Sequence, residues 1–188
     1  MGKKSMMEFS RKGDRGYTSL LGGEGDPVNK YRVPKYHPRP ESYGIVDEAN
    51  AALYMTRAGT RSEKVKEIVC SIQEDFSLLM AELATAPEAY EKSGYKITEG
   101  HVQRLEGLIQ ELQEDVELPS VFIMSKPCLS AAAIDLARTI VRRAERSVAR
   151  LRHDSIITND NVNSYLNRCA DLLWTLARYE EAMNDKCG

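Results

Sequence analysis

The sequence lacks a strong charge of either sign. Its 188 residues include 26 Lys and Arg against 28 Asp and Glu, which gives a formal net charge of −2 at pH 7. Such a balance argues against general nucleic-acid binding through a basic surface. No apolar run has the length of a membrane-spanning helix, and the opening MGKKSMME lacks the apolar core of a signal peptide. We therefore expect neither a nucleic acid nor a membrane as partner.

Cysteine is scarce as well. The four cysteines, Cys70, Cys128, Cys169 and Cys187, form no C-x-x-C pair, so a zinc or dithiol redox site is not expected. Free thiols without a disulfide framework fit a reducing compartment, and we expect a cytoplasmic protein. Cys169 falls on an apolar helical stripe, which indicates a small core residue.

The chain divides into an irregular start and a helical remainder. Residues 1–39 are rich in Gly, Lys and Arg and contain three prolines, which predicts a long loop-like arm. After Pro40, apolar residues recur at spacings of three and four. This pattern predicts five helices, at about 41–57, 62–84, 99–118, 129–153 and 160–184. No alternating β pattern is present, so we predict an all-α fold: a five-helix bundle at 40–184 with a long N-terminal loop arm, in one domain over 1–188.

A helical bundle raises the question of a di-iron centre inside it. Such a centre needs Glu-x-x-His on two helices. The three histidines are His37, His101 and His153, and none has Glu three residues before it. We therefore predict no metal site built from this chain's side chains.

The arm contains the stretch GDRGYTSLLGGE, which begins at Gly13. Glycines let backbone N–H groups turn toward an anion, and Arg11, Lys12 and Arg15 add positive charge. The Walker pattern G-x-x-x-x-G-K-[ST] is absent. From these residues alone, two interpretations stay open: a flexible basic terminus and an anion-binding loop.

Two further stretches carry polar residues on helices. In ARTIVRRAERSVARL, the spacing of Arg138, Arg142 and Glu145 places them on one helix face. That face is either a solvated surface with ion pairs or a phosphate-binding surface, because guanidinium matches phosphate oxygens. In NSYLNRCADLLWTLARYEE, Asn167 precedes the only tryptophan, Trp174, whose commonest fate is packing in a core.

Taken together, these stretches resemble one family. GDRGYTSLLGGE, ESYGIVDEANAAL, FIM with ARTIVRRAER, and YLNRCADLLWTLARY occur in the order and at the separations of the PduO-type ATP:cob(I)alamin adenosyltransferases, from about Phe9 to Tyr179. The resemblance implies a homotrimer of five-helix bundles with active sites at the subunit interfaces. It also implies transfer of the 5′-deoxyadenosyl group of ATP to cob(I)alamin, with Mg²⁺ beside the triphosphate that leaves.

The resemblance assigns a nucleotide site residue by residue. Six arm residues would line ATP: Ser10, Arg11, Gly13, Asp14, Gly16 and Thr18. Lys35 stands where the family has a lysine before the first helix, and it would neutralise phosphate. On the helices, Arg142, Glu145 and Asn167 match the residues that contact the nucleotide.

The same resemblance assigns residues to assembly and to the corrinoid. Asp47 and Arg138 match a charged pair that bridges subunits. Phe122 matches the aromatic that occupies the lower face of the corrin and excludes the axial base, and Trp174 falls where the family has an aromatic near the corrin. Catalysis would depend on Phe122, Arg142, Asp47 and Arg138.

One segment departs from the family. Ser125, Lys126 and Pro127 stand where the family usually has Pro-Gly-Gly, beside the expected corrinoid loop. This departure leaves an alternative open, in which the protein is a trimeric carrier that binds corrinoid or nucleotide without catalysis. The family's activity further implies a flavoprotein reductase and an adenosylcobalamin-dependent acceptor enzyme as partners.

Overall fold

The computed structural model describes residues 11–22, 31–118 and 128–185 of the chain. It contains the five expected α-helices: α1 (Pro38–Gly59), α2 (Glu63–Ala84), α3 (Glu99–Asp115), α4 (Leu129–His153) and α5 (Asp160–Asp185). The all-α prediction is confirmed. None of the helices in the described ranges is long and apolar enough to cross a membrane.

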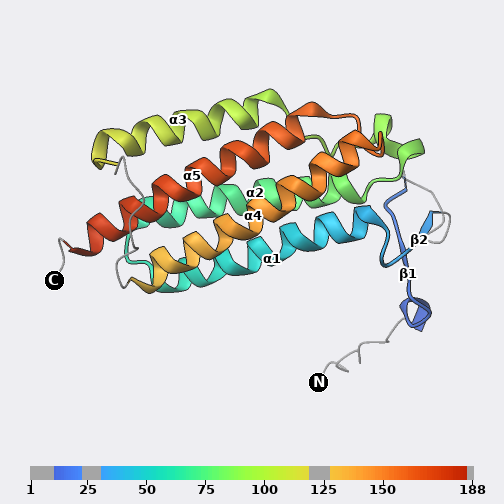
Figure 1. The fold of residues 1–188 in the computed structure, drawn as a ribbon, viewed down its shortest axis with the longest axis horizontal. Helices are drawn as coiled ribbons and strands as arrows, with labels where there is room; N and C mark the ends of the chain where they lie inside the picture. The colour runs from blue at the N-terminus through green and yellow to red at the C-terminus, as the bar shows by residue number, and fades with distance from the viewer. Residues whose placement is uncertain (1–10, 23–30, 119–127, 186–188) are drawn as a thin grey trace, which may run out of the picture.

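The helices lie side by side along one direction (Figure 1). α1 packs against both α4 and α2, and α4 packs against α5. α3 packs mainly on α5 and forms the outer edge of the bundle. Because successive helices alternate in direction, the first turn of α1 lies at the same end as the last turns of α2 and α4.

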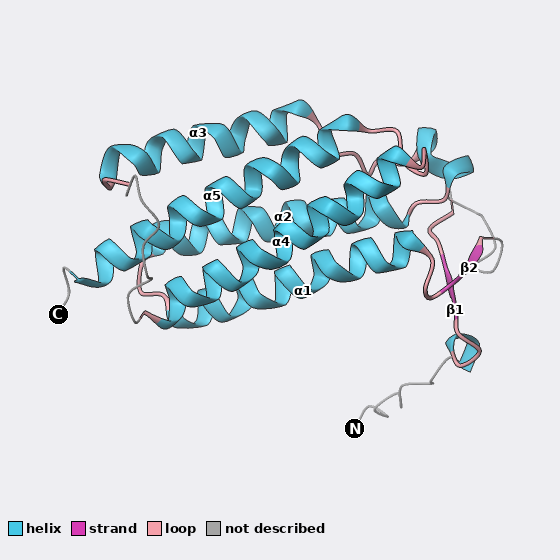
Figure 2. Ribbon diagram, in the orientation of Figure 1, coloured by secondary structure: helices cyan, strands magenta, loops and turns pink. Residues whose placement is uncertain are grey.

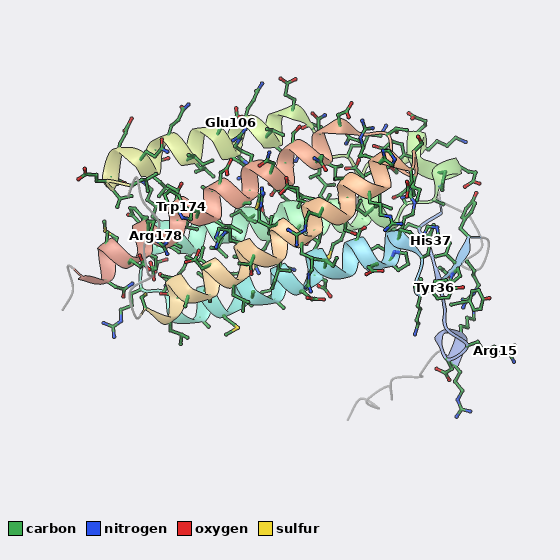
Figure 3. The ribbon with its side chains drawn as sticks, in the orientation of Figure 1. Arg15, Tyr36, His37, Glu106, Trp174 and Arg178 are labelled. Carbon is green, nitrogen blue, oxygen red and sulfur yellow. The ribbon has the colours of Figure 1, made fainter. Side chains whose placement is uncertain are left out.

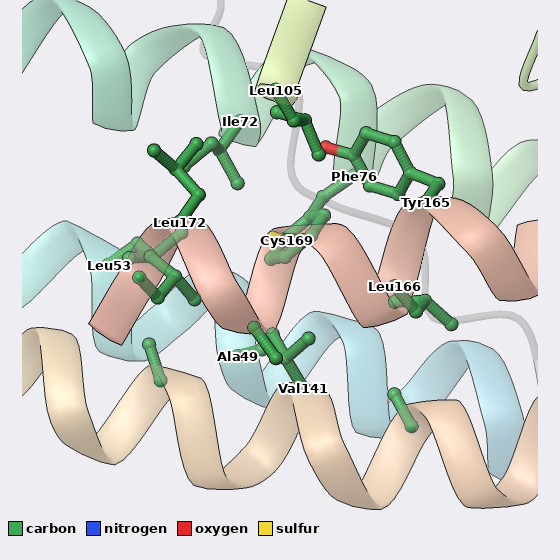
Figure 4. Packing of buried hydrophobic residues seen from close by; sticks show 14 of the residues in the cluster. Ala49, Leu53, Ile72, Phe76, Leu105, Val141, Tyr165, Leu166, Cys169 and Leu172 are labelled. Carbon is green, nitrogen blue, oxygen red and sulfur yellow. The ribbon is translucent and has the colours of Figure 1, made fainter. Parts of the chain in front are cut away.

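The core follows from the apolar spacing of three and four that the sequence contains. α2 contributes Ile72 and Phe76, and α5 contributes Tyr165, Leu166, Cys169 and Leu172, all fully buried (Figure 4). Burying a large apolar side chain stabilises the fold by about 1.5–3 kcal/mol, so each helix is held mainly by its inward stripe. The expected core position of Cys169 is confirmed.

The first helix begins earlier than predicted. We expected a start after Pro40, but α1 begins at Pro38, with His37 as N-cap and both prolines in the first turn. The His37 Nδ1 atom accepts a hydrogen bond from the backbone N–H of Arg39 at 3.2 Å. Proline is tolerated there because the first N–H groups of a helix have no intrahelical acceptor.

The arm is more ordered than the predicted loop (Figure 2). A short 3₁₀ turn, η1 (Arg11–Gly13), leads into strand β1 (Tyr17–Ser19), which pairs antiparallel with β2 (Arg32–Pro34). Strands of three residues are too short to show an alternating pattern, which is why sequence periodicity missed them.

The arm is fastened to the bundle just after β1. Leu20 is buried against Ala86 and Ala89, which lie at and beside the short turn η2 (Pro87–Lys92) that follows α2. The next residue, Leu21, donates its N–H to Ala84 O and accepts from Ala86 N, each at 2.8 Å. These contacts fix the arm at the end of α2, while η1 lies beyond the end of the bundle (Figure 1).

Candidate functional site

The outer part of the arm forms a positively charged hollow. Its volume is about 680 Å³, and five side chains line it: Arg11, Lys12, Arg15, Tyr17 and Arg32. Four of the five are cationic and none is acidic. A concave surface with that charge attracts an anion with several oxygens, such as a polyphosphate.

Lys35 does not line this hollow but lies beside η1, one residue after the end of β2. Its backbone N–H donates to Gly16 O at 2.8 Å, and its ammonium group lies close to Gly13. Gly16 has φ of +78°, a left-handed conformation that glycine adopts without strain. The turn therefore brings together four of the residues predicted to bind ATP, namely Arg11, Gly13, Gly16 and Lys35.

Two other arm residues predicted to bind ATP, Thr18 and Asp14, do not line the hollow. Thr18 lies in the ribbon, opposite Val33 in the register, and is half-buried. Asp14 is exposed in the turn after η1. Ser10 and Phe122 lie outside the described residues, as does the Ser125–Lys126–Pro127 departure.

The predicted polar face of α4 contains ion pairs. Arg142 Nη1 lies 2.8 Å from Glu145 Oε2, and Arg138 Nε donates to Asp135 Oδ1 at 2.9 Å. The Arg142 side chain is nevertheless 49% exposed, whereas Glu145 is mostly buried. The carboxylate of Glu145 thus orients a guanidinium that still has donors available for a ligand.

Asp47 and Arg138 do not meet within one chain. Asp47 is exposed on α1, and Arg138 makes its ion pair with Asp135 of its own helix. α1 and α4 are instead joined by an ion pair between Glu48 and Arg143. The expected Asp47–Arg138 pair was assigned to a subunit boundary, so it stays a prediction.

Of the two predicted residues on α5, Trp174 lies away from the arm. Asn167 is exposed, and Trp174 is half-buried rather than part of the core. Figure 3 shows Trp174 toward one end of the bundle and Arg15 beyond the opposite end. The predicted site residues therefore fall into separate groups on the chain.

A buried polar cluster near Trp174 was not predicted. Ser130 Oγ, in the first turn of α4, donates to the buried carboxylate of Glu180, and Arg178 Nη2 donates to Asp135 Oδ2 at 2.7 Å. Arg178 also pairs with Glu181 at 2.9 Å. These bonds tie the start of α4 to the last turns of α5. Partners more than 40 residues apart leave no local sequence signal.

A second hollow of about 640 Å³ lies between the arm and the end of the bundle. Arg39, only 4% exposed, lines it and donates to Leu83 O at 2.8 Å and Ile156 O at 2.6 Å. Burial lowers the pKa of Arg39. Glu82 accepts from Tyr90 Oη and Asn159 Nδ2, each at 2.7 Å. The protein itself satisfies these buried polar groups, so they support the fold rather than await a ligand.

The structure also bears on metal binding by side chains. Within residues 11–22, 31–118 and 128–185, no three His, Cys, Asp or Glu side chains converge as metal ligands. The charge in the arm hollow is positive, so the groups available there suit an anionic ligand.

The known proteins that this chain resembles are corrinoid adenosyltransferases. The sequence model of the family described as cobalamin adenosyltransferase matches residues 9–180. The corrinoid adenosyltransferase PduO of Salmonella typhimurium is 34% identical over 177 residues, which are 94% of this chain and 50% of that protein. A corrinoid adenosyltransferase of Citrobacter freundii is 31% identical over 95% of this chain and 97% of its own. The chain thus spans about half of the first relative and nearly all of the second.

Solved structures extend the comparison to the fold. A variant PduO-type ATP:corrinoid adenosyltransferase from Lactobacillus reuteri, complexed with cobalamin and ATP, superposes with a TM-score of 0.81 at 28% identity over 94% of each chain. A second variant from that organism, complexed with ATP, gives 0.81 at 27% identity over 95% of this chain and 96% of that one.

Proposed function

Because the chain belongs to the cobalamin adenosyltransferase family, we propose that it transfers the 5′-deoxyadenosyl group of ATP to cob(I)alamin and releases triphosphate. The observation that carries this proposal is the cationic hollow of the arm, with Lys35 and two glycines of the predicted ATP-binding motif beside it. The relatives named above act on or bind corrinoid and ATP, which supports the same substrates here.

In this reaction the protein has to stabilise negative charge and does not have to transfer a proton. Cob(I)alamin supplies the nucleophile: its cobalt electron pair forms the bond to C5′ of ATP, and cobalt is formally oxidised to Co(III). The C5′–O bond breaks, and its electron pair leaves with the triphosphate. Arg11, Lys35 and Arg142 hold the oxygens on which this negative charge grows, and Mg²⁺ accompanies the triphosphate. No general base is needed.

The active site is shared between subunits of a homotrimer. In this arrangement residues 1–39 form a nucleotide-binding arm and residues 40–184 form the helical bundle that receives it. The position of η1 beyond the end of its own bundle supports this, because a neighbouring α4 could then offer Arg142 and Glu145 to the same ATP. Asp47 and Arg138 pair across that boundary, and Asn167 contacts the nucleotide.

The corrinoid binds near Trp174 and Phe122. An apolar ring such as Phe122 on the lower face of the corrin removes the axial base without offering a new ligand, which makes Co(II) easier to reduce. A flavoprotein reductase supplies the electron, and an adenosylcobalamin-dependent enzyme accepts the product. The compartment is the cytoplasm, which agrees with the free thiols of Cys70, Cys128 and Cys169.

The alternative is a trimeric carrier that binds corrinoid or nucleotide without catalysis, favoured only by Ser125, Lys126 and Pro127 in place of Pro-Gly-Gly. One experiment separates the two. The protein is incubated anaerobically with cob(I)alamin and ATP, and adenosylcobalamin is followed by absorbance. We expect turnover. Binding of both ligands without any product would favour the carrier.

A further inference from the structure

We propose that Arg32 is a positioning residue that holds the arm's cationic hollow in its ATP-binding shape. This inference rests on the proposed ATP-dependent function and deepens it by adding a residue that lies outside the sequence stretches named above. Arg32 lies on β2 opposite Ser19 of β1, and its side chain lines the hollow together with Arg11, Lys12 and Arg15.

The contacts of Arg32 link the β1–β2 ribbon to the turn η1. Its Nη2 donates to the backbone carbonyl of Lys12 at 2.7 Å, and its Nη1 reaches Ser19 Oγ at 3.5 Å. The first bond spans 20 residues of sequence and ties η1 to the ribbon. The second, at 3.5 Å, is at the limit of a hydrogen bond and contributes little, so the bond to the Lys12 carbonyl is the brace.

η1 needs such a brace because it cannot hold its own shape. A single helical turn fixes several backbone angles in return for very few hydrogen bonds, so it is unstable alone. Within the turn, Asp14 N donates to Arg11 O at 3.2 Å and Gly16 N donates to Gly13 O at 3.1 Å. From outside, Lys35 N holds the carbonyl of Gly16, and Arg32 holds that of Lys12.

The consequence for ATP lies in pre-organisation. With the brace, the side chains of Arg11, Lys12 and Arg15 already surround the hollow before the nucleotide arrives. Without it, ATP must order the turn on binding and loses affinity by that cost. A bond to a charged donor is lost, so we expect the apparent affinity for ATP to fall roughly tenfold in Arg32→Ala. The turnover number should change far less, because the brace acts before chemistry.

The test measures amide hydrogen exchange and ATP binding on the full-length protein. In Arg32→Ala without ATP, the peptide covering residues 11–19 should exchange faster than in the wild type, while peptides from α2 stay unchanged. In the same variant KM for ATP should rise and kcat should remain nearly constant. The matched control is Arg61→Ala, which removes one exposed cation from the turn between α1 and α2, at the end of the bundle opposite the arm.

Three results would overturn the proposal. Weaker ATP binding with unchanged exchange in the unliganded protein would make Arg32 a direct phosphate contact. Faster exchange with unchanged ATP affinity would separate the order of the turn from binding. No change in either would leave Arg32 without a role in the arm. If the wild type bound no ATP at all, the proposed function would fail, whereas exchange over residues 11–19 would still report whether Arg32 braces the turn.

Discussion

The ammonium group of Lys35 lies against Gly13: a Cβ atom on Gly13 would stand 3.4 Å from Lys35 Nζ. That distance is an ordinary van der Waals contact, so alanine fits there, but its methyl group takes up space beside the ammonium group where an ATP phosphate would bind. We therefore expect Gly13→Ala to weaken ATP binding several-fold. Thermal stability should change little, since the methyl group meets only the end of a flexible side chain. Calorimetric titration with ATP measures the effect.

The control for that change is Gly107→Ala. Gly107 is exposed on α3, and a Cβ there would meet nothing within 4 Å. Alanine should leave ATP affinity unchanged and, as a better helix former, should stabilise the protein by about 0.5–1 kcal/mol. Equal ATP affinities in wild type and Gly13→Ala would argue against the placement of phosphate beside Lys35.

Replacing Arg142 by Ala should weaken ATP binding and lower turnover together. A guanidinium on the triphosphate acts in the ground state and in the transition state, and a charge-assisted hydrogen bond contributes about 1.5–3 kcal/mol, roughly ten- to a hundredfold. Steady-state kinetics against ATP measure both quantities. Arg150→Ala is the control, because the Arg150 side chain is 80% exposed on the same helix and its ion pair with Asp154 is long. Its Nε lies 3.8 Å from Asp154 Oδ2. Wild-type kinetics in Arg142→Ala would reduce this residue to a surface ion pair with Glu145.

Asp47→Arg should impair trimer formation or activity, because it places two cations together where a pair is expected. The double exchange, Asp47→Arg with Arg138→Asp, should restore part of the loss. Sedimentation velocity reports the assembly. Because Arg138 also bonds Asp135 in its own helix, Arg138→Asp alone has a cost inside the subunit. Strictly additive effects of the two changes would indicate that Asp47 and Arg138 do not touch.

Stability should decline above about pH 8.5, the usual pKa of a cysteine thiol. Burial, and then the nearby carboxylate of Asp75, raises the pKa of the Cys169 thiol. The unfolded chain therefore loses this proton first, and the free energy of unfolding falls as pH rises, by at most about 1.4 kcal/mol per pH unit for one group. In Cys169→Ala, the decline between about pH 8.5 and 9.5 should be shallower. Chemical denaturation at several pH values measures it, and identical slopes would contradict the assignment.

The sequence predicted the helices well because each carries its own apolar stripe. α2, for example, has buried residues at Val65, Ile68, Val69, Ile72 and Phe76, a local pattern that needs no knowledge of its neighbours. The start of α1 was misplaced because prolines in a first turn look like an interruption. The β1–β2 ribbon was missed because its strands are short and paired across a long connection.

The sequence predicted only those residues of the candidate site that belong to a recognisable motif. Lys35 and Gly13 were named from the family pattern, and the structure places them together. Arg32 escaped because its role depends on a carbonyl 20 residues away, not on its own neighbours in sequence. Arg39 was missed for the same reason, since it donates to the carbonyl of Leu83 in the last turn of α2, 44 residues further along the chain.

The fastening of the arm at Leu20, with its cationic turn beyond the end of the bundle, has a genetic consequence. If each active site joins the arm of one chain to α4 of the next, two damaged alleles can complement each other. Chains with Lys35→Ala retain an intact α4, and chains with Arg142→Ala retain an intact arm. A mixed trimer then contains a boundary where both halves are undamaged. Co-expression of the two variants should yield activity that neither has alone. Each active site would then depend on two neighbouring chains, and one damaged copy of the gene could be compensated by a differently damaged one.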